Sequence, residues 1–166
     1  MSIISFALLV IGLIILLFGF VVAFGAPFLP TLNKQTEDIF TLLNLNPGQI
    51  LLELGSGDGR VLLAAAKRGI TAIGYELNPL LATFSWLRCF RYRHLITVRW
   101  GNYWQASWPP CDGIYVFLLD KYMKKLDKKI IREISKPVKL VSFAFKIPNK
   151  RVVTESHGLL LYEYQK

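Results

Sequence analysis

The first 32 residues of the chain contain no Asp, Glu, Lys, Arg or His, although the whole chain has 20 Lys and Arg and 11 Asp and Glu. Residues 3–24 are strongly apolar, and at about 1.5 Å per residue they are long enough to cross the roughly 30 Å hydrocarbon core of a bilayer. The lack of a polar face argues against a helix buried in a globular core. We therefore expect one transmembrane helix, with residues 1–30 as an N-terminal anchor.

A cleaved signal peptide is the alternative for this segment, because small residues at 23–26 offer a cleavage site. Two features of the segment argue against a signal peptide. No basic residue precedes the apolar run, and the run is longer than the roughly 7–15 residues that are usual for a signal peptide.

Charge begins only at Lys34, so the whole net charge of +9 falls within residues 31–166. A segment of that length makes one domain of ordinary size. Because positive charge that flanks an anchor stays on the inner side of the membrane, we expect this domain on the cytoplasmic, or equivalent inner, face.

Cysteine is scarce, and the two residues present, Cys89 and Cys111, do not have the spacing of metal ligands. They fit reduced thiols in an inner compartment, and we interpret both as packing residues. No metal site is expected. Internal repeats and low-complexity stretches are also absent from the sequence.

Strand-like and helix-like segments alternate after the anchor. A helix is predicted from Thr36, as its N-cap, to a stop at 46–48. The segments that follow are a strand at 49–54, a helix at 60–68, a strand at 71–76, a helix from an Asn-Pro start at 78–79 to about 91, strands at 96–100, 113–119, 139–145 and 159–164, and a basic helix between 121 and 136. This alternation predicts an α/β fold with a doubly wound, mostly parallel sheet.

Three glycines follow the first strand in "ELGSGDGR". In an open parallel sheet, ligands bind beyond the carboxyl ends of the strands, where the strand order reverses. Gly55 and Gly57 can adopt positive φ and let backbone amides approach a ligand. Glu76 follows Gly55 by 21 residues, close to the spacing at which an acid in this fold accepts the hydroxyls of a ribose. The sequence therefore predicts a nucleoside site, although each feature alone is also compatible with tight packing or a surface acid.

The glycine pattern differs from the dinucleotide fingerprint, because Arg60 stands where G-x-G-x-x-G requires its third glycine. Glu53 also lies two residues before the first glycine, where its carboxylate would face the negative pyrophosphate of a dinucleotide. Such an acid suits a cationic ligand better.

"ELGSGDGR" followed by "GYELNP" resembles the first two motifs of class I S-adenosylmethionine-dependent methyltransferases, which have a Rossmann-like fold. Together with "PFLPT", the apolar segment and "KKLDKKIIREIS…LVSFAFKIP", these motifs are similar to the membrane-anchored protein-lysine methyltransferase family that includes the ATP synthase c-subunit lysine methyltransferase. The likeness extends over most of the chain.

This resemblance implies a set of residues around S-adenosylmethionine. The residues around its methionine part would be Glu53, Gly55, Ser56 and Gly57, in a loop shaped by Asp58 and Gly59. Glu76 would hold the ribose hydroxyls, with Leu77 and Asn78 near the adenine.

Asn102 departs from the family pattern, because it stands where the class usually has an Asp that accepts a hydrogen bond from the adenine amine. An amide oxygen can accept the same bond. Tyr103 and Trp104, which follow directly, could cover the base.

The methyl acceptor should bind beyond the fourth strand, where Asp120 and Tyr122 lie. Asp120 could accept the departing proton or orient an amine, while Tyr122 or Trp104 could wall a narrow slot. Alternatively, Asp120 caps the basic helix that follows. Nucleic-acid amino-methyltransferases commonly have Asn/Asp-Pro-Pro-aromatic here, and "LLDKY" lacks it, which argues against a base as the target.

Basic residues gather in two regions, 88–99 and 121–139. The second has apolar residues at helical spacing, which is typical of an ordinary solvated helix face. Beside a membrane span, such cationic faces could also bind anionic lipid, and RNA is a third possibility that the residues leave open.

We therefore predict a membrane-anchored enzyme that methylates a lysine of a protein, in or at the same membrane because a tether raises the effective concentration of such substrates. A lipid, a small molecule or RNA as acceptor is the first alternative. The second is a membrane scaffold that binds the cofactor without catalysis.

Overall fold

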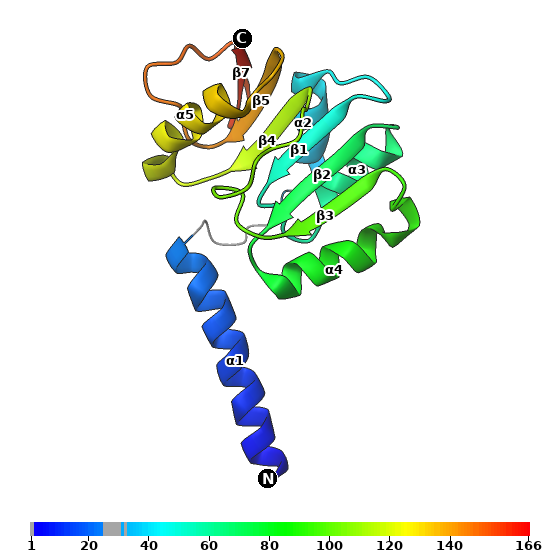
Figure 1. Cartoon of the computed structure of the whole chain (residues 1–166), viewed down its shortest axis with the longest axis vertical. Helices are drawn as coiled ribbons and strands as arrows, with labels where there is room; N and C mark the ends of the chain where they lie inside the picture. Colours follow the sequence, from blue (N-terminus) through cyan, green and yellow to red (C-terminus); the bar gives the residue numbers. More distant parts are fainter. Residues whose placement is uncertain (1, 25–30, 32) are drawn as a thin grey trace.

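The computed structural model describes residues 2–24, 31 and 33–166, and is shown in Figure 1. Seven strands form one sheet in the order β3-β2-β1-β4-β5-β7-β6. The strands are β1 (Ile50–Leu54), β2 (Thr71–Glu76), β3 (Ile96–Trp100), β4 (Gly113–Phe117), β5 (Val138–Phe143), β6 (Thr154–Ser156) and β7 (Leu159–Tyr164). The first five are parallel, and β7 and β6 are antiparallel additions at one edge. The predicted doubly wound, mostly parallel sheet is confirmed.

Helices cover both faces of the sheet. They are α2 (Asn33–Leu43), α3 (Arg60–Lys67), α4 (Pro79–Cys89) and α5 (Met123–Glu133), with short 3-10 turns at Phe90–Tyr92 and Asp120–Tyr122. Apolar residues of α2 and α3 pack in one core cluster with Leu51 of β1, and those of α5 pack in the other with Leu52 and Leu54. Neighbouring leucines of β1 thus face two different cores, which explains why this strand has apolar residues on both of its faces.

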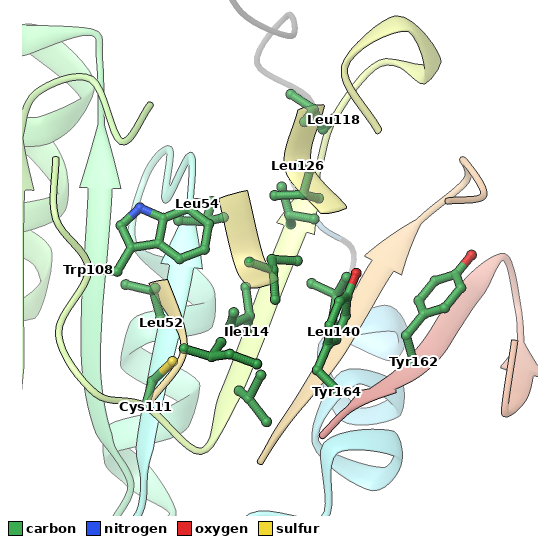
Figure 2. Close-up of a cluster of buried hydrophobic side chains, with 14 of the residues drawn as sticks. Leu52, Leu54, Trp108, Cys111, Ile114, Leu118, Leu126, Leu140, Tyr162 and Tyr164 are labelled. Atoms are coloured by element: carbon green, nitrogen blue, oxygen red, sulfur yellow. The ribbon is translucent and has the colours of Figure 1, made fainter. Parts of the chain in front are cut away.

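The core on the α5 side is built around the central strands, as Figure 2 shows. Ile114 of β4 and Leu140 of β5 are fully buried beside Leu126 of α5. The indole of Trp108 and the thiol of Cys111 belong to the same cluster. Cys111 and Cys89 are both free and buried, and burial raises their pKa to about 12 and about 11 respectively. This confirms their interpretation as packing residues.

Several boundaries differ from the sequence prediction, and β4 and β5 end two residues earlier than expected. α2 begins at Asn33, so Thr36 lies inside it and is not its N-cap. α4 ends at Cys89 and continues as a 3-10 turn, and α5 begins only at Met123 after another such turn. β6 is not predicted from the sequence, because its three polar residues, Thr-Glu-Ser, carry no apolar alternation.

The N-terminal α1 (Ile3–Phe24) has no acidic or basic residue in its first or last turn. Its described side chains are exposed, among them Ile3, Phe6 and Leu8. Within the described part of the chain, no helix meets the length and apolarity needed to cross a membrane. The transmembrane anchor expected over residues 1–30 is thus not shown, and its residues 1 and 25–30 lie outside the described residues.

Candidate functional site

The order of the strands reverses between β1 and β4, and the glycine loop leaves the carboxyl end of β1 at that point. Gly55, Gly57 and Gly59 have φ angles of +91°, +53° and +76°. The amides of Gly55 and Ser56 both donate to the carbonyl of Tyr75 at 2.9 Å, which fixes the loop to β2. A Cβ atom built on Gly55 would meet no atom within 4 Å. The loop is therefore open at the position predicted to face a ligand.

Gly59 allows close packing, because its lack of a side chain lets the start of α3 approach α4. A Cβ atom on Gly59 would lie 2.2 Å from the Oγ atom of Ser85. The Cys89 thiol, one turn further along α4, donates to the Gly59 carbonyl at 3.6 Å. The sequence placed Gly59 in the loop but gave no indication of Ser85, its neighbour in space.

Glu53 is buried in the middle of β1, between Gly74 of β2 and Tyr115 of β4 in the strand register. Its Oε2 atom has no hydrogen-bond partner among the described residues. Burial raises the pKa of Glu53 well above its ordinary value, and the nearby carboxylates Asp58 and Glu76 add to the effect. A buried carboxylate with an orphaned oxygen is costly unless a donor or a positive charge satisfies it.

Glu76, at the end of β2, faces the same loop. Its two oxygens accept hydrogen bonds from the amides of Gly57 and Asn78, both at 2.8 Å. Burial raises the pKa of Glu76, although the hydrogen bonds from the backbone of Asn78, Gly57 and Leu77 oppose this rise. Because each carboxylate oxygen can accept more than one hydrogen bond, both can still accept from a pair of hydroxyls.

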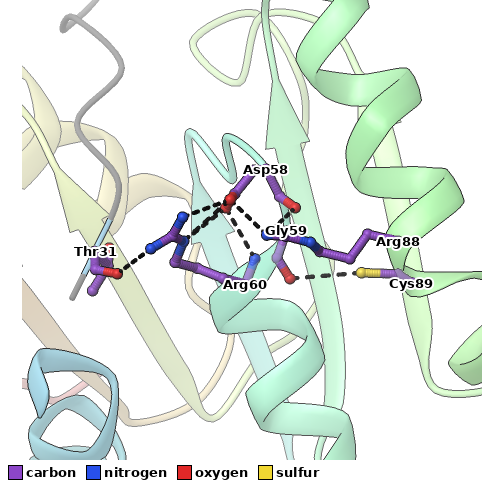
Figure 3. Close-up of polar contacts among 6 residues, drawn as sticks. All are labelled: Thr31, Asp58, Gly59, Arg60, Arg88 and Cys89. Atoms are coloured by element: carbon purple, nitrogen blue, oxygen red, sulfur yellow. Dashed lines mark hydrogen bonds and ion pairs between the residues drawn. The ribbon is translucent and has the colours of Figure 1, made fainter. Parts of the chain in front are cut away.

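Asp58 lies between Arg60 and Arg88 and so joins the glycine loop to α4, as Figure 3 shows. Its carboxylate accepts from Arg60 at 2.8 Å and from Arg88 of α4. Arg60 also donates to the carbonyl of Thr31 at 2.7 Å. Burial would raise the pKa of Asp58, but the two guanidinium groups outweigh it and hold the pKa below its ordinary value. Asp58 thus shapes the loop, as expected, and its partner on α4, Arg88, is one that the sequence did not reveal.

Asn78 is the N-cap of α4, as predicted. Its Oδ1 atom accepts from the amides of Leu80 and Leu81 at 2.9 and 3.3 Å. Its Nδ2 atom is buried without a hydrogen-bond partner in the described structure. Leu77 is partly buried, and its carbonyl accepts from the indole of Trp100 at 3.2 Å.

The segment after β3 brings an aromatic wall to the site. Asn102 stabilises the turn at the start of this segment, since its Oδ1 atom accepts a hydrogen bond from the amide of Trp104 at 2.9 Å. The ring centroids of Tyr103 and Trp104 are 4.9 Å apart, and those of Trp104 and Tyr122 are 6.2 Å apart. Burial raises the pKa of Tyr103, with further contributions from Tyr122 and Glu76. Tyr103, predicted to cover the adenine, and Tyr122, predicted to line the slot for the methyl acceptor, therefore both lie beside Trp104.

Asp120 lies in the 3-10 turn before α5 and is exposed. The start of α5 has no side-chain cap, so the Asp120 carboxylate does not cap it. The alternative that Asp120 caps the basic helix is not supported.

The donors and acceptors of the site fit a nucleoside that carries a positive charge. Glu53 has an orphaned oxygen, Asn78 has an orphaned amide nitrogen, and Glu76 retains accepting capacity. The space beside Gly55 leaves backbone within reach of a ligand.

Comparisons with known proteins agree with this geometry. Residues 53–154 match the ANTKMT methyltransferase domain. The chain is 34% identical over 125 residues to the ATP synthase c-subunit lysine N-methyltransferase of Homo sapiens, an alignment that covers 74% of this chain and 53% of the relative. It is also 34% identical over 125 residues to the adenine nucleotide translocase lysine N-methyltransferase of Mus musculus, with 74% and 54% covered. The chain thus spans about half the length of these curated relatives.

Among solved structures, an RNA methyltransferase from Salinibacter ruber in complex with S-adenosyl-L-homocysteine has a TM-score of 0.75 to this chain at 22% sequence identity. The match covers 82% of this chain and 93% of that one. At this identity the likeness shows that the two chains share a fold.

Proposed function

Because the chain belongs to the ANTKMT methyltransferase domain family, we propose that it transfers a methyl group from S-adenosylmethionine to the side-chain amine of a lysine in a protein. The observation that carries this proposal is the pair of buried acids, Glu53 and Glu76, on either side of an open glycine loop. The two relatives above, whose names describe lysine N-methyltransferases, support lysine as the acceptor.

S-adenosylmethionine supplies, when bound, an activated methyl group on a positively charged sulfur. The orphaned Oε2 atom of Glu53 is suited to this cationic end of the cofactor. Glu76 would accept the ribose hydroxyls, and Leu77, Asn78, Asn102 and Tyr103 would hold the adenine.

A lysine must lose its proton before its amine can accept a methyl group, because its reference pKa is about 10.4. Desolvation between aromatic rings favours the neutral amine. Trp104 and Tyr122, whose rings are neighbours, would provide such a slot, and Asp120 at its rim would receive the proton or orient the amine. The remaining requirements are alignment with the methyl group and exclusion of water.

Membrane attachment through α1, with the domain on the inner side and a substrate in the same membrane, is part of this proposal. Its support is the uncharged sequence of α1 and the exposure of its described apolar side chains. A tether of this kind would raise the local concentration of membrane-bound lysine substrates.

The test is to incubate the full chain with isolated membranes and radiolabelled S-adenosylmethionine, and then to separate protein, lipid and RNA. We expect label in protein, at lysine residues identified by mass spectrometry. Label in lipid or RNA would overturn the choice of acceptor. Calorimetry with S-adenosylmethionine and with NAD tests the cofactor, because only the first should bind, and binding without any transfer would indicate a scaffold.

A further inference from the structure

The outer surface of α4 carries large apolar side chains that remain exposed in the described structure. α4 buries Ala82, Ser85 and Cys89 against the sheet and α3. The exposed set, which we call the α4–β3 face, consists of Leu80, Phe84, Trp86, Leu87, Phe90 and, at the end of β3, Trp100. An apolar surface of this kind on a domain marks a site of interaction with a protein or a membrane.

The α4–β3 face contains two exposed tryptophans. Trp86 is 51% exposed and Trp100 is 71% exposed, and together they help line a groove of about 330 Å³. Tryptophan is enriched where proteins meet the headgroup level of a bilayer, because its ring is apolar and its N–H is polar.

The segment of the chain that forms this face carries charge of one sign. Between Glu76 and Asp112 the sequence has no acidic residue, and this stretch contains all four tryptophans of the chain. It also contains four arginines, of which Arg88 is paired with Asp58. Arg91 and Arg93 are exposed beside Phe90, with the guanidinium of Arg93 4.9 Å from the ring centroid of Phe90.

The other basic surface lacks this combination. α5 exposes Lys124, Lys125 and Lys128, but its only large apolar side chain that is exposed in the described structure is Ile131. Cationic charge without an apolar, aromatic surface is typical of an ordinary solvated helix.

We propose that the α4–β3 face docks the domain on a bilayer surface that contains anionic lipid. Trp86 and Trp100 lie at the headgroup level, and Arg91 and Arg93 bind lipid phosphates. The positive charge of the two arginines complements anionic lipid, and the exposed tryptophan rings favour the headgroup region of a bilayer. Asn78 caps α4, and Leu77 accepts a hydrogen bond from Trp100, so docking brings the ribose end of the candidate site next to the membrane surface.

Tryptophan fluorescence of the full chain tests this directly, because α1 contains no tryptophan. The chain is reconstituted into vesicles of phosphatidylcholine with about one third anionic phosphatidylglycerol, in which the acyl chains are brominated near the headgroups. We expect quenching that is lost in W86F/W100F, a variant that keeps aromatic rings and leaves the buried Trp108 in place. The double variant R91Q/R93Q should lower the docked-to-free ratio by about fivefold for each arginine.

A matched control is K124Q/K128Q, which removes the same charge from α5 and should leave quenching unchanged. Absence of quenching in the reconstituted wild-type chain would overturn the proposal, as would equal quenching in wild type and R91Q/R93Q. Loss of binding to a labelled RNA oligonucleotide in R91Q/R93Q, with no quenching by lipid, would assign the face to nucleic acid instead. Methyl transfer plays no part in these readouts, so failure here is separate from failure of the proposed enzymatic function.

Discussion

Arg88 of α4 and Asp58 of the glycine loop form an ion pair across 30 residues of sequence. The same guanidinium also donates to the Asp58 carbonyl at 3.3 Å. Asn78, the N-cap of α4, lies in the candidate site, and the Arg88–Asp58 pair ties the last turn of the helix to the glycine loop, so both ends of α4 are held at this edge of the sheet.

Replacing Asp58 with Asn should destabilise the protein by about 1–3 kcal/mol, because two guanidinium groups lose a largely buried carboxylate. The pKa of Asp58 is lowered in the folded state, so its contribution is present above its ordinary value of 3.8 and is lost as the pH falls through the lowered pKa. Urea unfolding at several pH values measures this. The matched control is Glu37→Gln, which removes the exposed pair with Arg68 and should change stability little. An equal loss in both variants would contradict the prediction.

Two of the loop glycines should respond differently to alanine. Gly59→Ala adds a methyl group that overlaps the Oγ atom of Ser85, on top of about 1–3 kcal/mol for the left-handed backbone, and should lower the melting temperature strongly. Gly55→Ala carries the backbone strain alone, since its Cβ meets open space. We expect Gly55→Ala to weaken cofactor binding more than it lowers stability, as measured by calorimetry and thermal unfolding of the same samples.

The parts of the site that the sequence predicts are the local ones. The bounds of β2 and the N-cap at Asn78 follow from short runs of residues, and the structure confirms both. By contrast, the contact of Gly59 with Ser85 and the pairing of Asp58 with Arg88 depend on how α3 and α4 pack, which no periodicity encodes. The short spacing of Asp58 and Arg60 was the one visible indication of this cluster.

Asp120→Asn should lower kcat for methyl transfer to protein lysine by about 10²-fold while leaving the affinity for S-adenosylmethionine unchanged. The expected loss rests on the proposed role of Asp120 in receiving the proton. The structural cost should be small, because Asp120 is exposed and makes no cap to α5. Initial rates with membrane-fraction protein and calorimetry with the cofactor separate the two effects. An unchanged kcat would remove Asp120 from the mechanism.

Glu53 should make the stability of the unligated chain depend on pH. Its folded pKa is raised above its ordinary value of 4.5, so its contribution is fully present below that pH and is lost as the pH rises through the raised pKa. The pKa of Glu76 is raised as well, so Glu76 also makes stability depend on pH. Comparison of the wild type with Glu53→Gln isolates the contribution of Glu53. The free energy of unfolding of the wild type, relative to that variant, should fall with rising pH. A difference that does not change with pH would contradict the burial of a titrating Glu53.

The same orphaned carboxylate should discriminate between the cofactor and its demethylated product, because only S-adenosylmethionine carries a positive charge on sulfur. Ionised Glu53 stabilises that charge, so cofactor binding lowers its pKa and releases protons at pH values between the pKa of the ligated state and that of the unligated state. In Glu53→Gln the affinity for S-adenosylmethionine should fall by about tenfold more than the affinity for S-adenosylhomocysteine, which corresponds to about 1.4 kcal/mol. Calorimetry with both ligands in two buffers of different ionisation enthalpy measures affinity and proton release together. Equal losses for the two ligands would mean that Glu53 supports the loop and does not contact the charged sulfur.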